Sequence, residues 1–187
     1  MKVDADVRDG LLSVEEFRTL PEEDGHRLEL SRGRVVREPA PGVRHGQIAF
    51  RFLELLQRYG KEEGLGLVLF DTGFVLTSQP ATVRVPDVAF VSADRLPEGR
   101  VPDGWGEGAP DVVVEVVSPS NSASEMQRRA LDYLDAGARL VWVADPASRT
   151  VTEYRSRSRI RILEGDDELE GGGVLPGLRA RVERLFA

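Results

Sequence analysis

A single carboxylate interrupts an otherwise continuous run of valines, and this feature constrains the fold more than any other. Residues 112–117 read Val-Val-Val-Glu-Val-Val, with Glu115 inside the apolar stretch. Short apolar runs rich in β-branched residues are typical of strands buried on both faces. Because an unpaired buried charge is very costly, Glu115 needs a compensating partner. Three interpretations are open at this point: a metal ligand, the partner of a structural arginine, or a strand with one solvated face.

The bulk composition indicates one soluble domain. The chain has 187 residues, with 41% hydrophobic and 30% charged side chains, and we expect a single domain over residues 1–187. Within it, we expect residues 1–11 to be flexible and residues 164–187 to form a C-terminal extension. A net charge of −7 disfavours a non-specific nucleic-acid coat, but it leaves room for an enzyme with a local basic path.

The cellular location is predicted from what the sequence lacks. No apolar run approaches the roughly 20 residues of a membrane-spanning helix, and no signal peptide opens the chain. The absence of cysteine excludes disulfides, thiolate metal sites and cysteine nucleophiles. We therefore expect a cytoplasmic protein with no membrane association.

The periodicity of apolar residues predicts a mixed α/β domain, with a central sheet and flanking helices. A hairpin is expected over 26–38, and a long loop rich in proline and glycine over 92–110. The tail after residue 171 is expected to form a turn and a short terminal helix. The expected helices cover residues 12–20, a segment that begins after residue 45 and ends near residue 60, and residues 124–136. The expected strands cover residues 67–77, 84–91, 111–117, 139–146 and 150–163.

A metal ligand requires a second carboxylate near Glu115. Asp111 shares its strand face, but four residues of strand separate the two by about 13 Å, too far to share one ion. Asp87 follows Pro86 at the start of the preceding strand, and a proline in a strand indicates an edge or a bulge. Two acidic residues on neighbouring strands fit a Mg²⁺ site, which typically uses one or two carboxylates together with waters and substrate phosphate.

These residues resemble a known pattern. A Pro-Asp on one strand and a glutamate inside an apolar strand resemble the PD-(D/E)XK nuclease superfamily. The closer resemblance is to the Uma2 family, formerly domain of unknown function 820, and it runs from about residue 12 to the end. It rests on the segments RLELSRGRVV, RHGQIAF, VPDVAFV, PDVVVEVVSPSNS and RRALDYLDAGARLVWVADP.

The resemblance implies a restriction-endonuclease-like fold with an N-terminal helix and β-hairpin, and Mg²⁺-dependent hydrolysis of DNA phosphodiester bonds. Asp87 and Glu115 match the two carboxylates that hold Mg²⁺, with Mn²⁺ as an alternative ion. The family pattern expects a lysine four residues before Tyr133, where this chain has Arg129. Because arginine keeps its proton, it can stabilise phosphate charge but cannot act as a general base. A homodimer is a further expectation that only the resemblance carries.

Helical spacing decides which arginine of the third helix can reach the site. Met126, Ala130 and Tyr133 share one face, with Arg129 at its border and Arg128 pointing to solvent. We therefore assign Arg129, not Arg128, to the pocket, together with Tyr133.

Two residues of the N-terminal half match the family pattern with an open role. Glu29, in the first hairpin, is either an additional ligand or base, or an ordinary solvated glutamate. His45, which we place just before the second helix, is either a pocket residue or a hydrogen-bonding group at the helix entry.

Two segments are candidates for contacts with nucleic acid. Arginine occupies every second position at Arg155, Arg157, Arg159 and Arg161. On a single strand these side chains would share one face and could contact successive phosphates of a nucleic acid. The alternative is a solvent-facing edge strand whose charges discourage aggregation. Ser120 belongs to a group of small polar residues before the third helix, whose ordinary role is turn formation and capping, with substrate contact as the alternative.

The sequence leaves three functions open. The first is a Mg²⁺-dependent endonuclease acting on DNA. The second is a catalytically silent relative that binds nucleic acid or a protein partner. The third is a structural dimer in which Glu115 pairs with Arg129, and a direct ion pair between these two residues with no room for metal would favour it.

Overall fold

The structure is a computed structural model that describes residues 10–96, 101 and 103–187. The expected flexible segment 1–11 therefore lies almost entirely outside the described residues. The α-helices are α1 (Val14–Arg18), α2 (Val43–Leu56) and α3 (Ala123–Asp135). A π-helical turn over Gln57–Lys61 continues α2, and 3-10 turns cover Ala93–Arg95 and Val182–Leu185.

The strands form three sheets. The largest has the order β11-β10-β9-β8-β6-β3, the second the order β2-β1-β5-β4-β7, and the third pairs β12 with β13. In chain order the strands are β1 (His26–Ser31), β2 (Arg34–Pro39), β3 (Gly66–Phe70), β4 (Phe74–Ser78), β5 (Ala81–Arg84), β6 (Val88–Ser92), β7 (Gly106–Glu107), β8 (Val112–Val116), β9 (Leu140–Asp145), β10 (Thr150–Ser156), β11 (Arg159–Glu164), β12 (Glu168–Glu170) and β13 (Arg179–Arg181).

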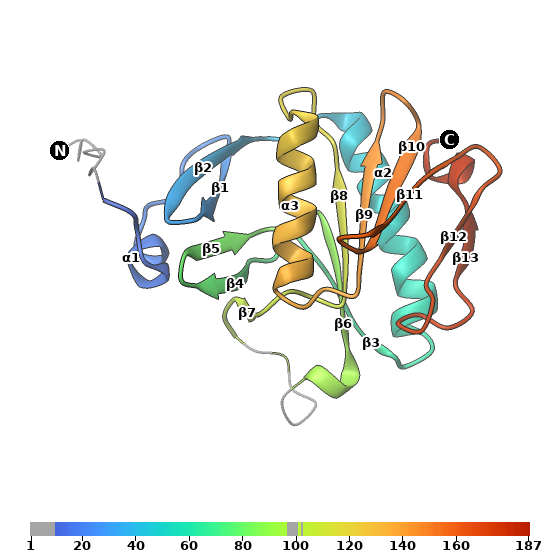
Figure 1. Cartoon of the computed structure of the whole chain (residues 1–187), viewed down its shortest axis with the longest axis horizontal. Coiled ribbons are helices and arrows are strands. Elements are labelled where there is room, and N and C mark those ends of the chain that lie inside the picture. The colour runs from blue at the N-terminus through green and yellow to red at the C-terminus, as the bar shows by residue number, and fades with distance from the viewer. Residues whose placement is uncertain (1–9, 97–100, 102) are drawn as a thin grey trace.

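The six-stranded sheet lies between two helices, with α3 in front of it and α2 behind it (Figure 1). On β8, Val112, Val114 and Val116 pack in the cluster that includes the apolar face of α2. Val113 packs on the opposite side, with α3. This alternation is the one predicted from the valine run, and it places Glu115 on the face that α3 covers.

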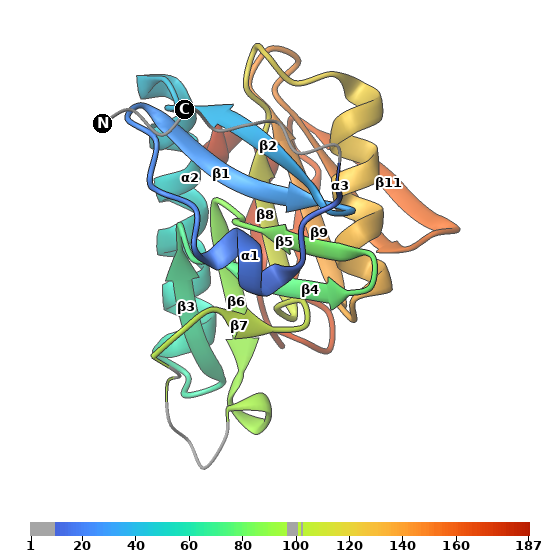
Figure 2. The ribbon, with the colours of Figure 1, turned by 90° about the vertical axis from the view of Figure 1, so that its left-hand side faces the viewer.

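The five-stranded sheet stands beside the larger one and carries the N-terminal elements. Figure 2 faces this sheet and shows α1 lying across it. The capping box predicted for α1 forms between Ser13 and Glu16, and the predicted hairpin is β1 and β2. The mixed α/β fold, with helices flanking a central mixed sheet, is therefore as expected.

Two segments expected to be single strands are each divided between the two sheets. Residues 67–77 form β3 in the larger sheet and β4 in the smaller one, and residues 84–91 form β5 and β6 in the reverse order. The chain thus crosses between sheets at Asp71 and again at Asp87, next to Pro86, which has no N–H to donate to a ladder. Of the two alternatives that Pro86 indicated, an edge or a bulge, the edge is wrong, because β6 pairs with both β3 and β8.

The arginine-rich segment is also divided. Residues 150–163 form the antiparallel strands β10 and β11, with Arg157 in the turn between them, so the expected continuous strand is wrong. The tail ends in a short 3-10 helix, and Leu169, Leu178 and Phe186 belong to the same core as α2. None of the described helices is long and apolar enough to cross a membrane.

Candidate functional site

The junction between the two sheets gathers the acidic residues. Glu115 comes from β8, Asp87 from the crossover before β6, and Glu29 and Glu38 from the hairpin β1–β2. All four are buried, with Glu29 entirely inaccessible and Glu115 only 2% exposed. Such burial requires cationic partners, and arginines from three different elements supply them.

Arg129 is the hub of this cluster. Its Nη1 donates to Glu29 Oε2 at 2.7 Å and to Glu38 Oε1 at 3.1 Å, and its Nη2 donates to Glu29 Oε1 at 2.9 Å and to Glu115 Oε1 at 3.0 Å. The prediction that Arg129 turns inward is confirmed, since it is 3% exposed whereas Arg128 is exposed. Its pKa lies well above the usual value because the surrounding carboxylates outweigh burial, so it remains charged.

Glu29 is held more tightly than the sequence indicated. Besides the two bonds from Arg129, Oε2 accepts a hydrogen bond from Arg84 at 2.9 Å and Oε1 accepts one from the Val85 N–H at 2.9 Å. Burial alone would raise the pKa of Glu29, but the charges of Arg129 and Arg84 lower it below the usual value. The alternative of a solvated Glu29 is therefore wrong, because the small sheet packs this face of β1 against α3 and its arginine.

Glu115 has a different environment. Its Oε1 accepts hydrogen bonds from Arg129 and from Tyr133 Oη, the latter at 2.8 Å. Burial and the nearby charges of Asp87 and Glu29 outweigh Arg129, and they raise the pKa of Glu115 to about 6. Among the described side chains, both donors to Glu115 bind Oε1, which leaves Oε2 as the oxygen available to a cation.

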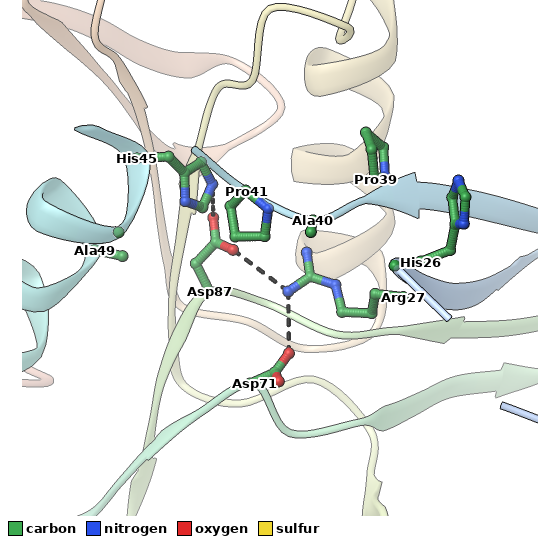
Figure 3. A pocket seen from close by; sticks show the side chains of 11 residues that line it. His26, Arg27, Pro39, Ala40, Pro41, His45, Ala49, Asp71 and Asp87 are labelled. Atoms are coloured by element: carbon green, nitrogen blue, oxygen red, sulfur yellow. Dashed lines mark hydrogen bonds and ion pairs between the residues drawn. The ribbon is translucent and has the colours of Figure 1, made fainter. Parts of the chain in front are cut away.

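Asp87 is held from three sides. His45 Nε2 lies 3.1 Å from Oδ2, the Val116 N–H donates to the same oxygen at 2.7 Å, and Arg27 Nη1 lies 3.5 Å from Oδ1. Burial alone would raise the pKa of Asp87, but the hydrogen bond and charge of His45, with Arg27, lower it. Figure 3 shows His45 and Arg27 converging on Asp87, with Arg27 also reaching Asp71.

His45 lies in the first turn of α2, not before the helix as expected. Burial lowers its pKa, but the hydrogen bond and charge of Asp87 prevail and raise it above the usual value. His45 is therefore a partner of Asp87 as well as a lining residue of the pocket.

Two adjoining cavities open at this junction. The smaller one, of about 20 Å³, is lined by residues that include Asp87, Glu115, Arg129 and His45. The larger one, of about 430 Å³, is lined by residues that include Arg27, His45 and Asp87 as well. The structure therefore brings Asp87, Glu115 and Arg129 to one pocket, as the sequence predicted.

The donor set fits a divalent cation in its chemistry. The cluster joins three arginines to five carboxylates, so carboxylate oxygens, the ligands that Mg²⁺ prefers, outnumber the arginines that balance them. Its members are Arg27, Arg84, Arg129, Glu29, Glu38, Asp87, Glu115 and Asp132. No group of three or more metal-ligating side chains occurs among the described residues, so an ion here would depend on Asp87, Glu115 and waters, as Mg²⁺ commonly does.

The remaining predicted residues lie outside the pocket. Arg155 binds Glu153 and Arg157 binds Asp135, while Arg159 begins the exposed strand β11. Arg157 lies in the turn and leaves the expected series, whereas the pairing of Glu153 with Arg161 places Arg161 and Arg159 on the face of Glu153, to which Arg155 is bonded. Ser120 is exposed in the turn before α3, whose cap is Ser122.

Sequence reasoning missed four members of the cluster. Arg27, Glu38 and Arg84 lie on neighbouring strands of the five-stranded sheet, and Asp132 lies on α3, so the contact between this sheet and α3 completes the cluster. The sequence did indicate that Arg27 lies near Glu29, because the two residues are two positions apart on β1 and their side chains share one face. Asp111 was correctly set apart from Glu115, since its Oδ2 accepts the Ser92 N–H at the other end of β8.

Comparison with known proteins agrees with this arrangement. The family model Uma2, described as "Putative restriction endonuclease", matches residues 14–183. The crystal structure of a putative nuclease belonging to DUF820 from Anabaena variabilis superposes with a TM-score of 0.82 and 22% sequence identity. The match covers 94% of this chain and 97% of that one, and at this identity it shows the fold. A comparison with curated proteins gives no match.

Proposed function

Because the chain belongs to the Uma2 family of putative restriction endonucleases, we propose that it is a Mg²⁺-dependent endonuclease that hydrolyses DNA phosphodiester bonds. The observation that carries the proposal is the convergence of Asp87 and Glu115 on one buried pocket at the junction of the sheets. Bound Mg²⁺, or Mn²⁺ in its place, would activate a water and neutralise phosphate charge there.

The side chains of the pocket would bind the ion, orient its ligands and contact the phosphate. Asp87 and Glu115 would hold the ion, with Tyr133 and the Val116 N–H fixing the orientation of their carboxylates. Arg129 is a positioning residue, because both of its terminal nitrogens are bound to carboxylates. Arg27 is the cation best placed to reach a phosphate, since its side chain is 28% exposed and it lines both cavities.

Metal binding is the first test. Isothermal titration of Mg²⁺ and Mn²⁺ should show binding to the wild type and none to Glu115→Gln or Asp87→Asn. Glu153→Gln is the matched control, because Glu153 is also a buried strand glutamate, 2% exposed and paired with Arg155, on a strand outside the pocket. Cleavage of plasmid DNA should then depend on the same two carboxylates. Failure of the wild type to bind millimolar metal in the presence of DNA would contradict the proposal.

A second function is favoured by one observation. The direct ion pair between Glu115 and Arg129 is present, at 3.0 Å, as expected for a structural dimer. The other half of that criterion was a lack of room for metal, and it is not met, because a cavity of about 20 Å³ adjoins Glu115. A volume above about 10–15 Å³ admits a particle the size of water.

The silent alternative and the homodimer have separate tests. A wild-type protein that binds DNA but neither binds metal nor cleaves would be the silent relative, and Arg129 would then serve only to neutralise the cluster. Light scattering after size exclusion would test the proposed dimer, and cell fractionation would test the proposed cytoplasmic location.

A further inference from the structure

The larger cavity has two chemically distinct sides. Pro39, Ala40 and Pro41 form an apolar wall, and Ala49 of α2 lies across from them (Figure 3). On the polar side of the cavity, Arg27 lies between two carboxylates and binds both Asp71 and Asp87. A volume of about 430 Å³ falls within the roughly 300–1,000 Å³ typical of pockets that bind small organic groups.

Two exposed phenylalanines adjoin this cavity. Phe70 directly precedes the lining residue Asp71 and is 66% exposed, and Phe50 directly follows the lining residue Ala49 and is 56% exposed. Phe70 pairs with Val88 across β3 and β6, so its side chain lies on the sheet face that α2 covers. Phe70 therefore lies on the α2 side of the sheet, beside the lining residue Asp71, and Phe50 lies on α2 itself, beside the lining residue Ala49.

The polar groups of the cavity are paired with one another, which argues for a flat, uncharged group as the main occupant. Arg27 lies between the carboxylates of Asp71 and Asp87, and His45 contacts Asp87 from the other side. The base of an unpaired nucleotide has this character, because it stacks on apolar surfaces and aromatic rings whatever its sequence.

We propose that this cavity receives an unpaired nucleotide, so that the protein binds single-stranded or frayed nucleic acid in preference to intact duplex. The base lies against the wall of Pro39–Pro41, Phe70 and Phe50 stack on the neighbouring bases, and the adjoining phosphate faces Arg27. This inference rests on the proposed function, for which it names the substrate class.

Binding without metal tests the inference separately from catalysis. The probes are a short fluorescein-labelled oligothymidylate and a labelled blunt-ended DNA hairpin whose strands are joined by a polyethylene glycol linker instead of a nucleotide loop, and fluorescence anisotropy is measured in EDTA. The single strand should bind roughly tenfold more tightly than the hairpin, and Phe70→Ala should weaken single-strand binding about tenfold. Ile162→Ala is the control, because Ile162 is 69% exposed on β11, at the other edge of the sheet from β3.

A second variant blocks the cavity itself. Gly46 lines it, and a side chain at this helical position would meet no atom within 4 Å of its Cβ. Gly46→Leu should therefore fold normally and lose single-strand binding, while Gly46→Ala, its matched control, should retain most of it. The Tm of each variant verifies folding.

The possible results separate this inference from the proposed function. Equal or tighter binding of the hairpin, or Phe70→Ala behaving like Ile162→Ala, would overturn the inference even if plasmid cleavage is found. Single-strand binding that falls in Phe70→Ala and Gly46→Leu would uphold the pocket even if no metal-dependent cleavage occurs, in which case only the proposed function fails.

Discussion

Glu29 and Glu115 share the guanidinium of Arg129, yet their pKa values shift in opposite directions. Glu29 has a second arginine and a backbone N–H, and its pKa falls. Glu115 is buried beside two like charges and accepts hydrogen bonds from only one arginine, and its pKa rises to about 6. Of the two carboxylates, Glu115 is therefore the one that a further cation would stabilise more.

Replacement of Arg129 by lysine should cost stability. A lysine ammonium is a point charge and cannot make the four hydrogen bonds that this guanidinium distributes over Glu29, Glu38 and Glu115. We expect Arg129→Lys to lower the free energy of unfolding by about 1.5–3 kcal/mol, the scale of a lost hydrogen bond to a charged group. Urea unfolding measures the change. Arg128→Lys, at the exposed neighbour, should stay within about 0.5 kcal/mol of the wild type.

The same variant tests whether the family's lysine is needed for catalysis. If Arg129 acts only by positioning carboxylates, the plasmid cleavage rate of Arg129→Lys should not exceed that of the wild type. A clear gain in rate, despite lower stability, would mean that the reaction requires an amine at this position.

Removal of the Tyr133 hydroxyl should lower the free energy of unfolding without leaving a cavity in the core. Tyr133 is fully buried and donates to Glu115 Oε1 at 2.8 Å. Tyr133→Phe leaves the carboxylate with one donor fewer, and we expect a loss of about 1–3 kcal/mol, measured by urea unfolding.

Tyr154→Phe is the control for that measurement. Tyr154 is 7% exposed in the same apolar cluster, and its hydroxyl forms no hydrogen bond with the described residues. Equal losses for the two variants would show that the bond to Glu115 contributes nothing specific.

The lowered pKa of Glu29 predicts how the free energy of unfolding depends on pH. Its pKa is lower in the folded than in the unfolded state, so its stabilising contribution is present above the usual value of 4.5 and is lost as the pH falls through the folded pKa. The gap in unfolding free energy between the wild type and Glu29→Gln should therefore be largest near neutral pH and shrink in acid. Glu23→Gln, at an exposed ion pair with Arg37, should show a much smaller gap. A gap for Glu29→Gln that does not change with pH would contradict the assignment.

Asp111 should prove structural. It accepts the Ser92 N–H at 2.8 Å and lies near Arg95 and Arg139, far along β8 from Glu115. We expect Asp111→Asn to lower the Tm and to leave the Mg²⁺ affinity unchanged in calorimetry. Loss of metal binding in a variant that remains folded would place Asp111 in the metal site after all.

Local sequence patterns were sufficient to predict several helices and strands of this fold, but not all of their boundaries. The capping residue Ser13, the hairpin of β1 and β2 and the apolar face of α3 all follow from interactions within a few residues, and each forms as predicted. The strand boundaries failed at Asp71, Asp87 and Arg157, since a change of sheet or a tight turn leaves no mark on the alternation of side chains.

The sequence by itself predicted that Glu115 lies within a buried strand and that Arg129 turns inward, because strand alternation and helical spacing are local rules. Only the tertiary structure decided how the charge is balanced. Arg27, Glu38 and Arg84 of the five-stranded sheet reach Glu115, Arg129 and Asp132 because this sheet packs beside the larger one and against α3. Contacts between such distant segments depend on how whole sheets pack, and no local pattern encodes that.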